Sequence, residues 1–149
     1  MQIEARLREL GIELPVAAQP VATYVRYAQS GNLLLISGTG PSDSAPKGNV
    51  GQDLTIEQGY GVAREVGLQL IATAQAALGD LDRVKRVLKV LGMVASAPDF
   101  YDHPKVINGC SDLLVEIFGD KGKHTRSAVG FVALPSNIAV EIECMLEVE

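Results

Sequence analysis

Apolar residues recur three or four positions apart in three segments of the chain, and this spacing predicts helices. The segments run from Ile3 to Leu10, from Thr55 to Gly79 and from Asp102 to Gly119. In the second segment Gln58 follows Thr55 by three residues, which is the spacing of a capping box. At the start of the third segment Asp102 is expected to cap the helix. The two longer helices are therefore expected to form the helical layer of the fold, and the first is expected to be a short appendage.

Further segments have the β-branched and aliphatic composition of strands. They cover residues 22–29, 32–37, 84–95, 127–133 and 138–148. The resulting order, ββαβαββ, predicts an α+β domain with a mixed sheet and two helices on one face, because a doubly wound fold would alternate strand and helix throughout. We expect one such domain over residues 21–149, preceded by an N-terminal helix and linker over residues 1–20.

The other face of the predicted sheet has no helix to cover it. Apolar residues make up 47% of the chain and the mean hydropathy is +0.17. No apolar run approaches the roughly 18 residues of a membrane span. Apolar surface without a cover in its own chain is most simply buried against other copies of that chain. The sequence therefore predicts a homo-oligomer that does not enter a membrane.

Charge and cysteine content narrow the classes of function. The formal net charge is −5 and the pI is about 5.0, which opposes binding to the phosphate backbone of nucleic acids. The first ten residues alternate charged and apolar side chains instead of forming a signal peptide, which predicts a cytoplasmic protein. Cys110 and Cys144 are too few for a disulfide framework or a zinc site, so both are expected to be buried thiols.

Familiar cofactor and metal motifs are incomplete in this chain. Gly38-Thr39-Gly40 follows a strand, but Pro41 stands where a dinucleotide-binding loop needs a free helix start. Gly122-Lys123 resembles part of a phosphate loop, but His124 replaces the hydroxyl that binds magnesium. His103 and His124 lack the spacing of a metal-binding pair. We expect neither a cofactor nor a metal.

Arg126 is the strongest candidate for a ligand-binding residue. It stands at the head of a strand built otherwise from small and apolar residues, which is a poor position for a side chain that is merely solvated. A planar guanidinium binds a carboxylate through two parallel hydrogen bonds, so arginine suits a recessed site for a small acid. The alternative is a structural ion pair with a glutamate of the same chain, and residue types alone leave both open.

Acidic residues share one face of the last strand. By the two-residue repeat of a strand, Glu141, Glu143 and Glu147 point to one side. The residues that point to the other side are Val140, Ile142, Cys144, Leu146 and Val148. If Glu141 lies on a strand beside Arg126, it could neutralise the arginine or orient a water next to a bound substrate. The alternative is a solvated carboxylate on an exposed face.

Short motifs over most of the chain, from about Tyr24 to Val148, resemble those of the Rid/YjgF family of reactive intermediate deaminases, also described as endoribonuclease L-PSP-like. The motifs are Ile36-Ser37-Gly38 with Pro41, Asn108, Arg126-Ser127, Leu134-Pro135 and Val140-Glu141-Ile142-Glu143. The added N-terminal helix indicates a longer branch of that family.

The resemblance implies a chorismate-mutase-like fold and a homotrimer whose sheets line a central barrel, with sites in clefts between subunits. It also implies hydrolysis of 2-imino or enamine acids to 2-keto acids and ammonia without a cofactor. Arg126 matches the family's carboxylate-binding arginine, and Glu141 matches its water-positioning glutamate. The resemblance further assigns to the cleft the residues Tyr24, Ser37, Gly38, Asn108, Ser127 and Gly130.

The sequence departs from the best-known deaminase pattern at three cleft positions, which hold Gly40, Ala128 and Gly130. These departures leave open a second function, in which the same cleft binds a small carboxylic acid without turnover. A third function, the endoribonuclease activity of some relatives, suits an acidic chain poorly.

Overall fold

The computed structural model describes residues 1–20 and 22–149, and within them five strands form one mixed sheet. The strand order is β1-β2-β5-β3-β4, with β3 and β4 parallel and the other neighbours antiparallel. The strands are β1 (Tyr27–Ser30), β2 (Leu33–Thr39), β3 (Val84–Ala95), β4 (Thr125–Phe131) and β5 (Val140–Val148). The predicted α+β class with a mixed sheet is confirmed. Val21, where the predicted domain begins, lies outside the described residues.

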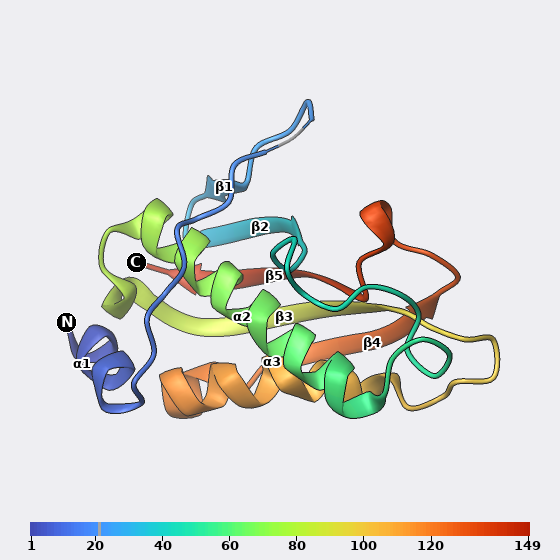
Figure 1. The fold of residues 1–149 in the computed structure, drawn as a ribbon. Helices are drawn as coiled ribbons and strands as arrows, with labels where there is room; N and C mark the ends of the chain where they lie inside the picture. The colour runs from blue at the N-terminus through green and yellow to red at the C-terminus, as the bar shows by residue number, and fades with distance from the viewer. Residues whose placement is uncertain (21) are drawn as a thin grey trace.

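Two long helices lie side by side on one face of the sheet (Figure 1). They are α2 (Ile56–Leu78) and α3 (His103–Phe118), and a short α1 (Gln2–Glu9) lies beside α3. None of the helices in the described part of the chain covers the opposite face of the sheet (Figure 1). None of them is both long and apolar enough to cross a membrane.

Local sequence signals set the ends of the long helices. The capping box is present, since the Gln58 amide donates to Thr55 Oγ1 (3.1 Å) and the Thr55 amide donates to Gln58 Oε1 (2.9 Å). Gly79 ends α2 with a φ of 79°, which a residue without a side chain adopts freely. The prediction that Asp102 caps α3 is wrong, because its side chain accepts no hydrogen bond from an amide of the helix. Asp102 precedes α3, but its ψ of 33° is not extended, and its carboxylate pairs with Lys105 instead of an amide.

Three strands are shorter or shifted relative to their predicted bounds. β4 covers 125–131 and not 127–133, because its partner β3 is paired from Lys89 to Ala95 and ends opposite Phe131. β1 begins at Tyr27 and not at residue 22, since the sheet is irregular beyond Ile36, which pairs with Tyr27. β5 begins at Val140 and not at residue 138, because the pairing of β3 with β5 ends at the pair of Val94 and Val140.

The core lies between the helices and the sheet and includes both cysteines. Cys110 of α3 and Cys144 of β5 are free and buried, as predicted. Burial raises the pKa of the Cys110 thiol to about 12 and also raises the pKa of the Cys144 thiol. Neither thiol is therefore a reactive thiolate near neutral pH.

The backbones of helices α2 and α3 approach each other closely at Gly109. A Cβ atom at this position would collide with the carbonyl oxygen of Tyr60 and lie 3.0 Å from the amide nitrogen of Arg64. Backbone atoms cannot move aside as a flexible side chain can. Gly61 of α2 differs, because a Cβ atom there would meet nothing within 4 Å.

This contrast makes a matched pair of glycine substitutions. We expect Gly109→Ala to lower the free energy of unfolding by about 1–3 kcal/mol, the usual cost of overpacking a core. Gly61→Ala should raise it by up to about 1 kcal/mol, because alanine is the better helix former. Urea unfolding of both variants measures the two shifts. A stabilised Gly109→Ala variant would show that helix propensity outweighs the helix contact.

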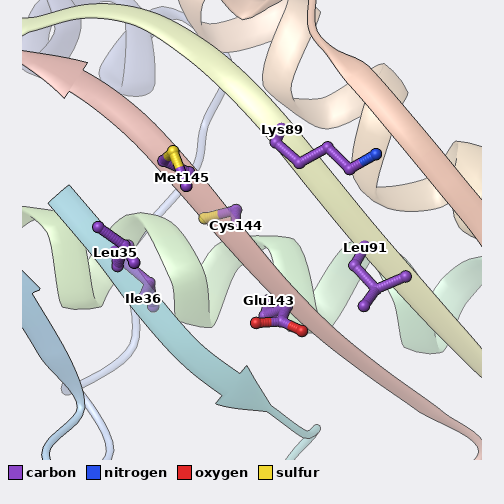
Figure 2. Close-up of a pocket in the computed structure, with 7 residues that line it drawn as sticks. All are labelled: Leu35, Ile36, Lys89, Leu91, Glu143, Cys144 and Met145. Atoms are coloured by element: carbon purple, nitrogen blue, oxygen red, sulfur yellow. The ribbon is translucent and has the colours of Figure 1, made fainter. Parts of the chain in front are cut away.

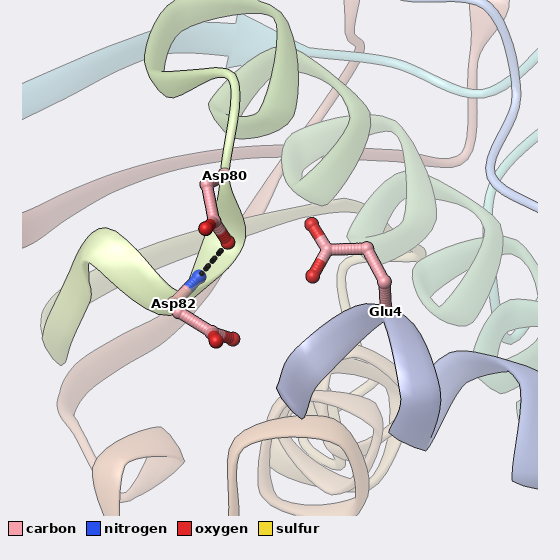
Figure 3. A group of neighbouring side chains, drawn as sticks. All are labelled: Glu4, Asp80 and Asp82. Carbon is pink, nitrogen blue, oxygen red and sulfur yellow. Dashed lines mark hydrogen bonds between the residues drawn. The ribbon is translucent and has the colours of Figure 1, made fainter. Parts of the chain in front are cut away.

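A group of acidic side chains fastens α1 to the rest of the molecule (Figure 3). Carboxylate oxygens of Glu4, Asp80 and Asp82 lie within 4.8 Å of one another. Asp82 accepts bonds from the Met1 amine and from the amides of Gln2 (2.7 Å) and Ile3 (2.8 Å), and these bonds lower its pKa to about 2. Asp80 accepts a bond from the Asp82 amide (2.9 Å). Asp82 therefore caps the first turn of α1 from outside the helix.

Candidate functional site

Arg126 lies near the start of the edge strand β4 and extends over α3. Its Nη1 donates to Asn108 Oδ1 (2.8 Å) and to Ser111 Oγ (3.1 Å), and its Nη2 lies 3.5 Å from the Pro104 carbonyl oxygen. These three partners are spaced along one face of α3. Arg126 and Asn108, both predicted as site residues, are thus brought together, and the helix sets the orientation of the guanidinium.

No carboxylate neutralises this guanidinium within the described residues. The ion pairs of residues 1–20 and 22–149 involve other side chains, and none has an oxygen within 4.0 Å of an Arg126 nitrogen. The alternative of an internal arginine–glutamate pair is therefore wrong for this part of the chain. A half-buried arginine held only by neutral acceptors keeps its charge available for an anion.

His124 belongs to the same network, although the sequence analysis considered it only as a metal or phosphate-loop residue. Its Nε2 lies 2.9 Å from Ser111 Oγ and its Nδ1 lies 2.6 Å from the Gly122 carbonyl oxygen. Burial lowers its pKa, and the charge of Arg126 adds to this effect. The two-residue spacing between His124 and Arg126, which places both on one side of an extended segment, could have indicated it.

The residues around Arg126 line a shallow pocket of about 290 Å³ between α3 and β4. Its lining consists of Asn108, Ser111, Val115, Lys123, His124 and Arg126. Positive and neutral polar groups face this pocket, and its lining contains no acidic side chain. An anion of a few atoms is the ligand that such a lining favours.

Glu141 of β5, two strands away from β4, belongs to a second polar group with Gly38 and Arg26. A Cβ atom at Gly38 would lie 3.2 Å from Glu141 Cδ, so the missing side chain makes room for the carboxylate. Arg26 donates to Thr39 Oγ1 (2.7 Å), and its Nη1 lies 3.4 Å from both the Gly38 oxygen and the Tyr24 hydroxyl. Arg26 was not predicted, and the sequence offered no local signal for it.

The pKa of Glu141 is raised mainly by burial and secondly by the negative charge of Glu143. Arg26 acts in the opposite direction but does not cancel the effect. A carboxylate that is half-buried and less acidic than usual is better suited to accept a proton or a hydrogen bond from water.

The condition that Glu141 lies on a strand beside Arg126 is not met within one chain. Strand β3 runs between them, with Arg126 paired to Val90 and Glu141 paired to Met93. Paired residues point to the same side of a sheet, and positions three apart point to opposite sides. Arg126 therefore shares the helix-covered side with buried Val90, whereas Glu141 lies on the uncovered side. The arginine group consists of Arg126, Asn108, Ser111 and His124, and the glutamate group consists of Glu141, Gly38 and Arg26. The two groups are separate in the protomer.

The remaining predicted residues are distributed around these groups. Ser37 donates through its hydroxyl to the Val25 carbonyl (2.6 Å), close in sequence to the glutamate group. Ser127 lies on the uncovered side, 3.5 Å from Lys89 Nζ. Gly130 leaves space for the His103–Ser96 pair, whose Nε2 and Oγ atoms are 3.1 Å apart. Among the described residues, no hydrogen bond joins Ser127 or Gly130 to the side chain of Arg126 or Glu141.

The uncovered side of the sheet carries a hollow of about 240 Å³ (Figure 2). Leu35, Leu91 and Met145 give it an apolar surface, and Lys89 and Glu143 lie beside them. Leu35 is 43% exposed, although it is a large apolar residue in the middle of a strand. This surface is the part of the sheet that the sequence predicts to be buried against other copies.

Comparison with known proteins agrees with this fold. The family model described as “YjgF/chorismate mutase-like, putative endoribonuclease” matches residues 4–147. The chain therefore belongs to the YjgF/chorismate mutase-like family. This finding confirms the resemblance inferred from the motifs.

Individual relatives match along nearly the whole chain. Protein TCP17 of Trypanosoma cruzi is 44% identical over 98% of this chain and 94% of its own length. The crystal structure of Atu1372 from Agrobacterium tumefaciens has a TM-score of 0.91 and 43% identity, covering 99% of this chain and 92% of that one. The crystal structure of a “putative endoribonuclease” from Shewanella oneidensis has a TM-score of 0.93 and 33% identity, covering 98% of this chain and 99% of that one. The likeness thus extends over α1 as well as the sheet.

Proposed function

We propose that this protein is a deaminase that hydrolyses 2-imino or enamine acids to 2-keto acids and ammonia. The observation that carries the proposal is the Arg126 guanidinium, which faces a small pocket and has only neutral partners among the described residues. A carboxylate beside the imine carbon is the group that this guanidinium would bind through two hydrogen bonds.

The reaction makes few demands on the protein. A protonated imine is already electrophilic, so water adds to its carbon, a proton moves to nitrogen, and the C–N bond breaks to release ammonia and leave a C=O bond. Arg126 would hold the carboxylate in place, and Glu141 would orient the water and accept its proton. Every atom of the products comes from the imino acid and one water, and no redox step is involved.

We further propose that the working site forms between subunits of a homotrimer. In one chain the arginine group and the glutamate group lie on opposite sides of the sheet, so one copy cannot apply both to one substrate. A ring of three copies joins unlike surfaces, and each interface would bring the arginine group of one subunit to the glutamate group of its neighbour. The exposed apolar side of the sheet supports such an assembly.

Assembly and site sharing can be tested together. Light scattering should give about three times the protomer mass of 15.8 kDa. Subunits carrying Arg126→Ala and subunits carrying Glu141→Gln, each inactive alone, should regain about a quarter of the parent activity when mixed at random in one trimer, because one site in four then has both residues intact.

Two results would contradict this part of the proposal. A stable monomer at micromolar concentration would remove the interface site. Mixed trimers without any activity would show that both residues must come from one subunit. The control is the same mixing with two batches of Arg126→Ala, which should stay inactive.

The deaminase activity itself is tested with an imino acid generated in place. An amino-acid oxidase supplies the imine, and the protein should speed its disappearance and the release of keto acid. Tight binding of pyruvate without faster hydrolysis would favour the non-catalytic carboxylate-binding module, which the apolar Ala128 near the site also allows. Strong, salt-sensitive binding of RNA would instead favour the endoribonuclease named for relatives, against the net charge of −5.

A further inference from the structure

We infer that His124 is a positioning residue for Arg126 and acts through the hydroxyl of Ser111. Ser111 Oγ lies between the two side chains, 3.1 Å from Arg126 Nη1 and 2.9 Å from His124 Nε2. The inference rests on the proposed function, because it concerns how Arg126 is held ready for a carboxylate.

The hydrogen bonds that connect the Gly122 carbonyl, His124, Ser111 and Arg126 are called the relay below. Hydrogen-bond chemistry assigns the direction of each of them. The Gly122 oxygen is a carbonyl and can only accept, so the Nδ1 atom of His124, 2.6 Å away, must carry the proton. In the neutral ring Nε2 is then unprotonated and accepts from the Ser111 hydroxyl. Since the hydroxyl proton is committed to the ring, a lone pair of Ser111 Oγ is left for the N–H of Arg126.

The surroundings of His124 favour the neutral ring that this relay needs. The charged side chains that share its pocket, Lys123 and Arg126, are both positive, and Lys123 is paired with Asp120 at 3.0 Å. Burial and the Arg126 charge lower the pKa of His124. The Gly122 carbonyl acts in the opposite direction, but the net change is downward.

The relay completes a set of fixed contacts around one side of the guanidinium. Asn108 Oδ1 and Ser111 Oγ both accept from Nη1, and only the 3.5 Å contact to Pro104 involves Nη2. Nη1 is therefore oriented from α3, while Nη2 keeps capacity for a ligand. Loss of the relay would leave the Ser111 hydroxyl free to turn toward the helix backbone or water, and the guanidinium would lose one of its two strong contacts.

Nitrogen NMR of the whole protein tests the assignment directly. At pH 7.5 we expect Nδ1 of His124 to have the chemical shift of a protonated ring nitrogen and Nε2 that of an unprotonated one. This tautomer is the less common one for a histidine in water, so it reports the relay and not mere packing. The opposite tautomer, or a fast average of both, would overturn the inference.

Binding of pyruvate, measured by calorimetry, tests the consequence for Arg126. His124→Leu and Ser111→Ala should each weaken binding by about 5- to 10-fold, the effect of losing one ordinary net hydrogen bond. The double variant should be no weaker than either single one, because both remove the same relay. His124→Gln, which can still accept from Ser111 and donate to Gly122, should recover most of the affinity.

The outcomes separate this inference from the proposed function. If Arg126→Lys loses pyruvate but His124→Leu binds it like the parent, the positioning role is wrong and the proposed function stands. Additive losses in the double variant would also overturn the relay. If none of the variants, Arg126→Lys included, changes binding, the proposed function fails together with the inference.

Discussion

Arg126→Lys should weaken binding of pyruvate or 2-ketobutyrate by about 10- to 100-fold, because lysine keeps the charge but loses one of two parallel charge-assisted bonds. Turnover of a freshly generated imine should fall at least as much, since the carboxylate anchor also positions the reacting carbon. Calorimetry measures the binding, and an assay coupled to an amino-acid oxidase measures the turnover.

The control for this substitution is Arg64→Lys. Arg64 is paired with Glu116 at 2.9 Å on the outer surface of the helices, so its replacement should leave binding and turnover unchanged. Because Arg126 also joins β4 to α3, thermal unfolding and light scattering must show that each variant is intact. An intact Arg126→Lys variant that binds and turns over like the parent would mean that the arginine is only structural. Both the deaminase and the carboxylate-binding module would then be rejected.

Glu141→Gln should retain pyruvate affinity and lower kcat by about 100- to 10,000-fold, the usual contribution of a general base. Glutamine has nearly the same shape and can still fill the space beside Gly38, but it cannot accept a proton from water. A parallel loss of affinity would place Glu141 in binding and contradict the assigned role.

The pH profile provides a second readout for Glu141. The catalytic form is the carboxylate, so kcat/KM of the parent should fall as the pH drops through the Glu141 pKa. Because burial and Glu143 raise that pKa, the fall should begin at a higher pH than for an ordinary glutamate. Glu143→Gln removes the like charge, keeps kcat and should move the acid limb to lower pH. A profile that Glu143→Gln leaves unchanged would mean that another group titrates.

Much of the local structure could be predicted because its causes are local. The capping box at Thr55 and Gln58 and the glycine at position 79 determine α2 within a few residues of sequence. The two-residue repeat in β5 separates acidic from buried residues as expected. The cap at Asp102 failed because its backbone conformation depends on how the preceding loop packs.

The candidate site could be predicted only in part, and the missing part is long-range. Arg26 and His124 were missed as site residues because their partners, such as Thr39 Oγ1 and Ser111 Oγ, meet them only after the sheet and helix have packed. The motifs named Arg126 and Asn108 separately, and the fold brings Arg126 Nη1 within 2.8 Å of Asn108 Oδ1. They said nothing of the third acceptor, Ser111, which lies one further turn along α3.

The sequence by itself determined the element types, the α+β class, the family and the identity of Arg126 and Glu141 as the residues to examine, because these depend on side-chain chemistry and on short-range periodicity. Only the tertiary structure decided that β3 lies between β4 and β5, and so that Arg126 and Glu141 lie on opposite sides of the sheet. Strand order is set by pairing between distant segments, whose hydrogen bonds and buried area exist only in the folded chain.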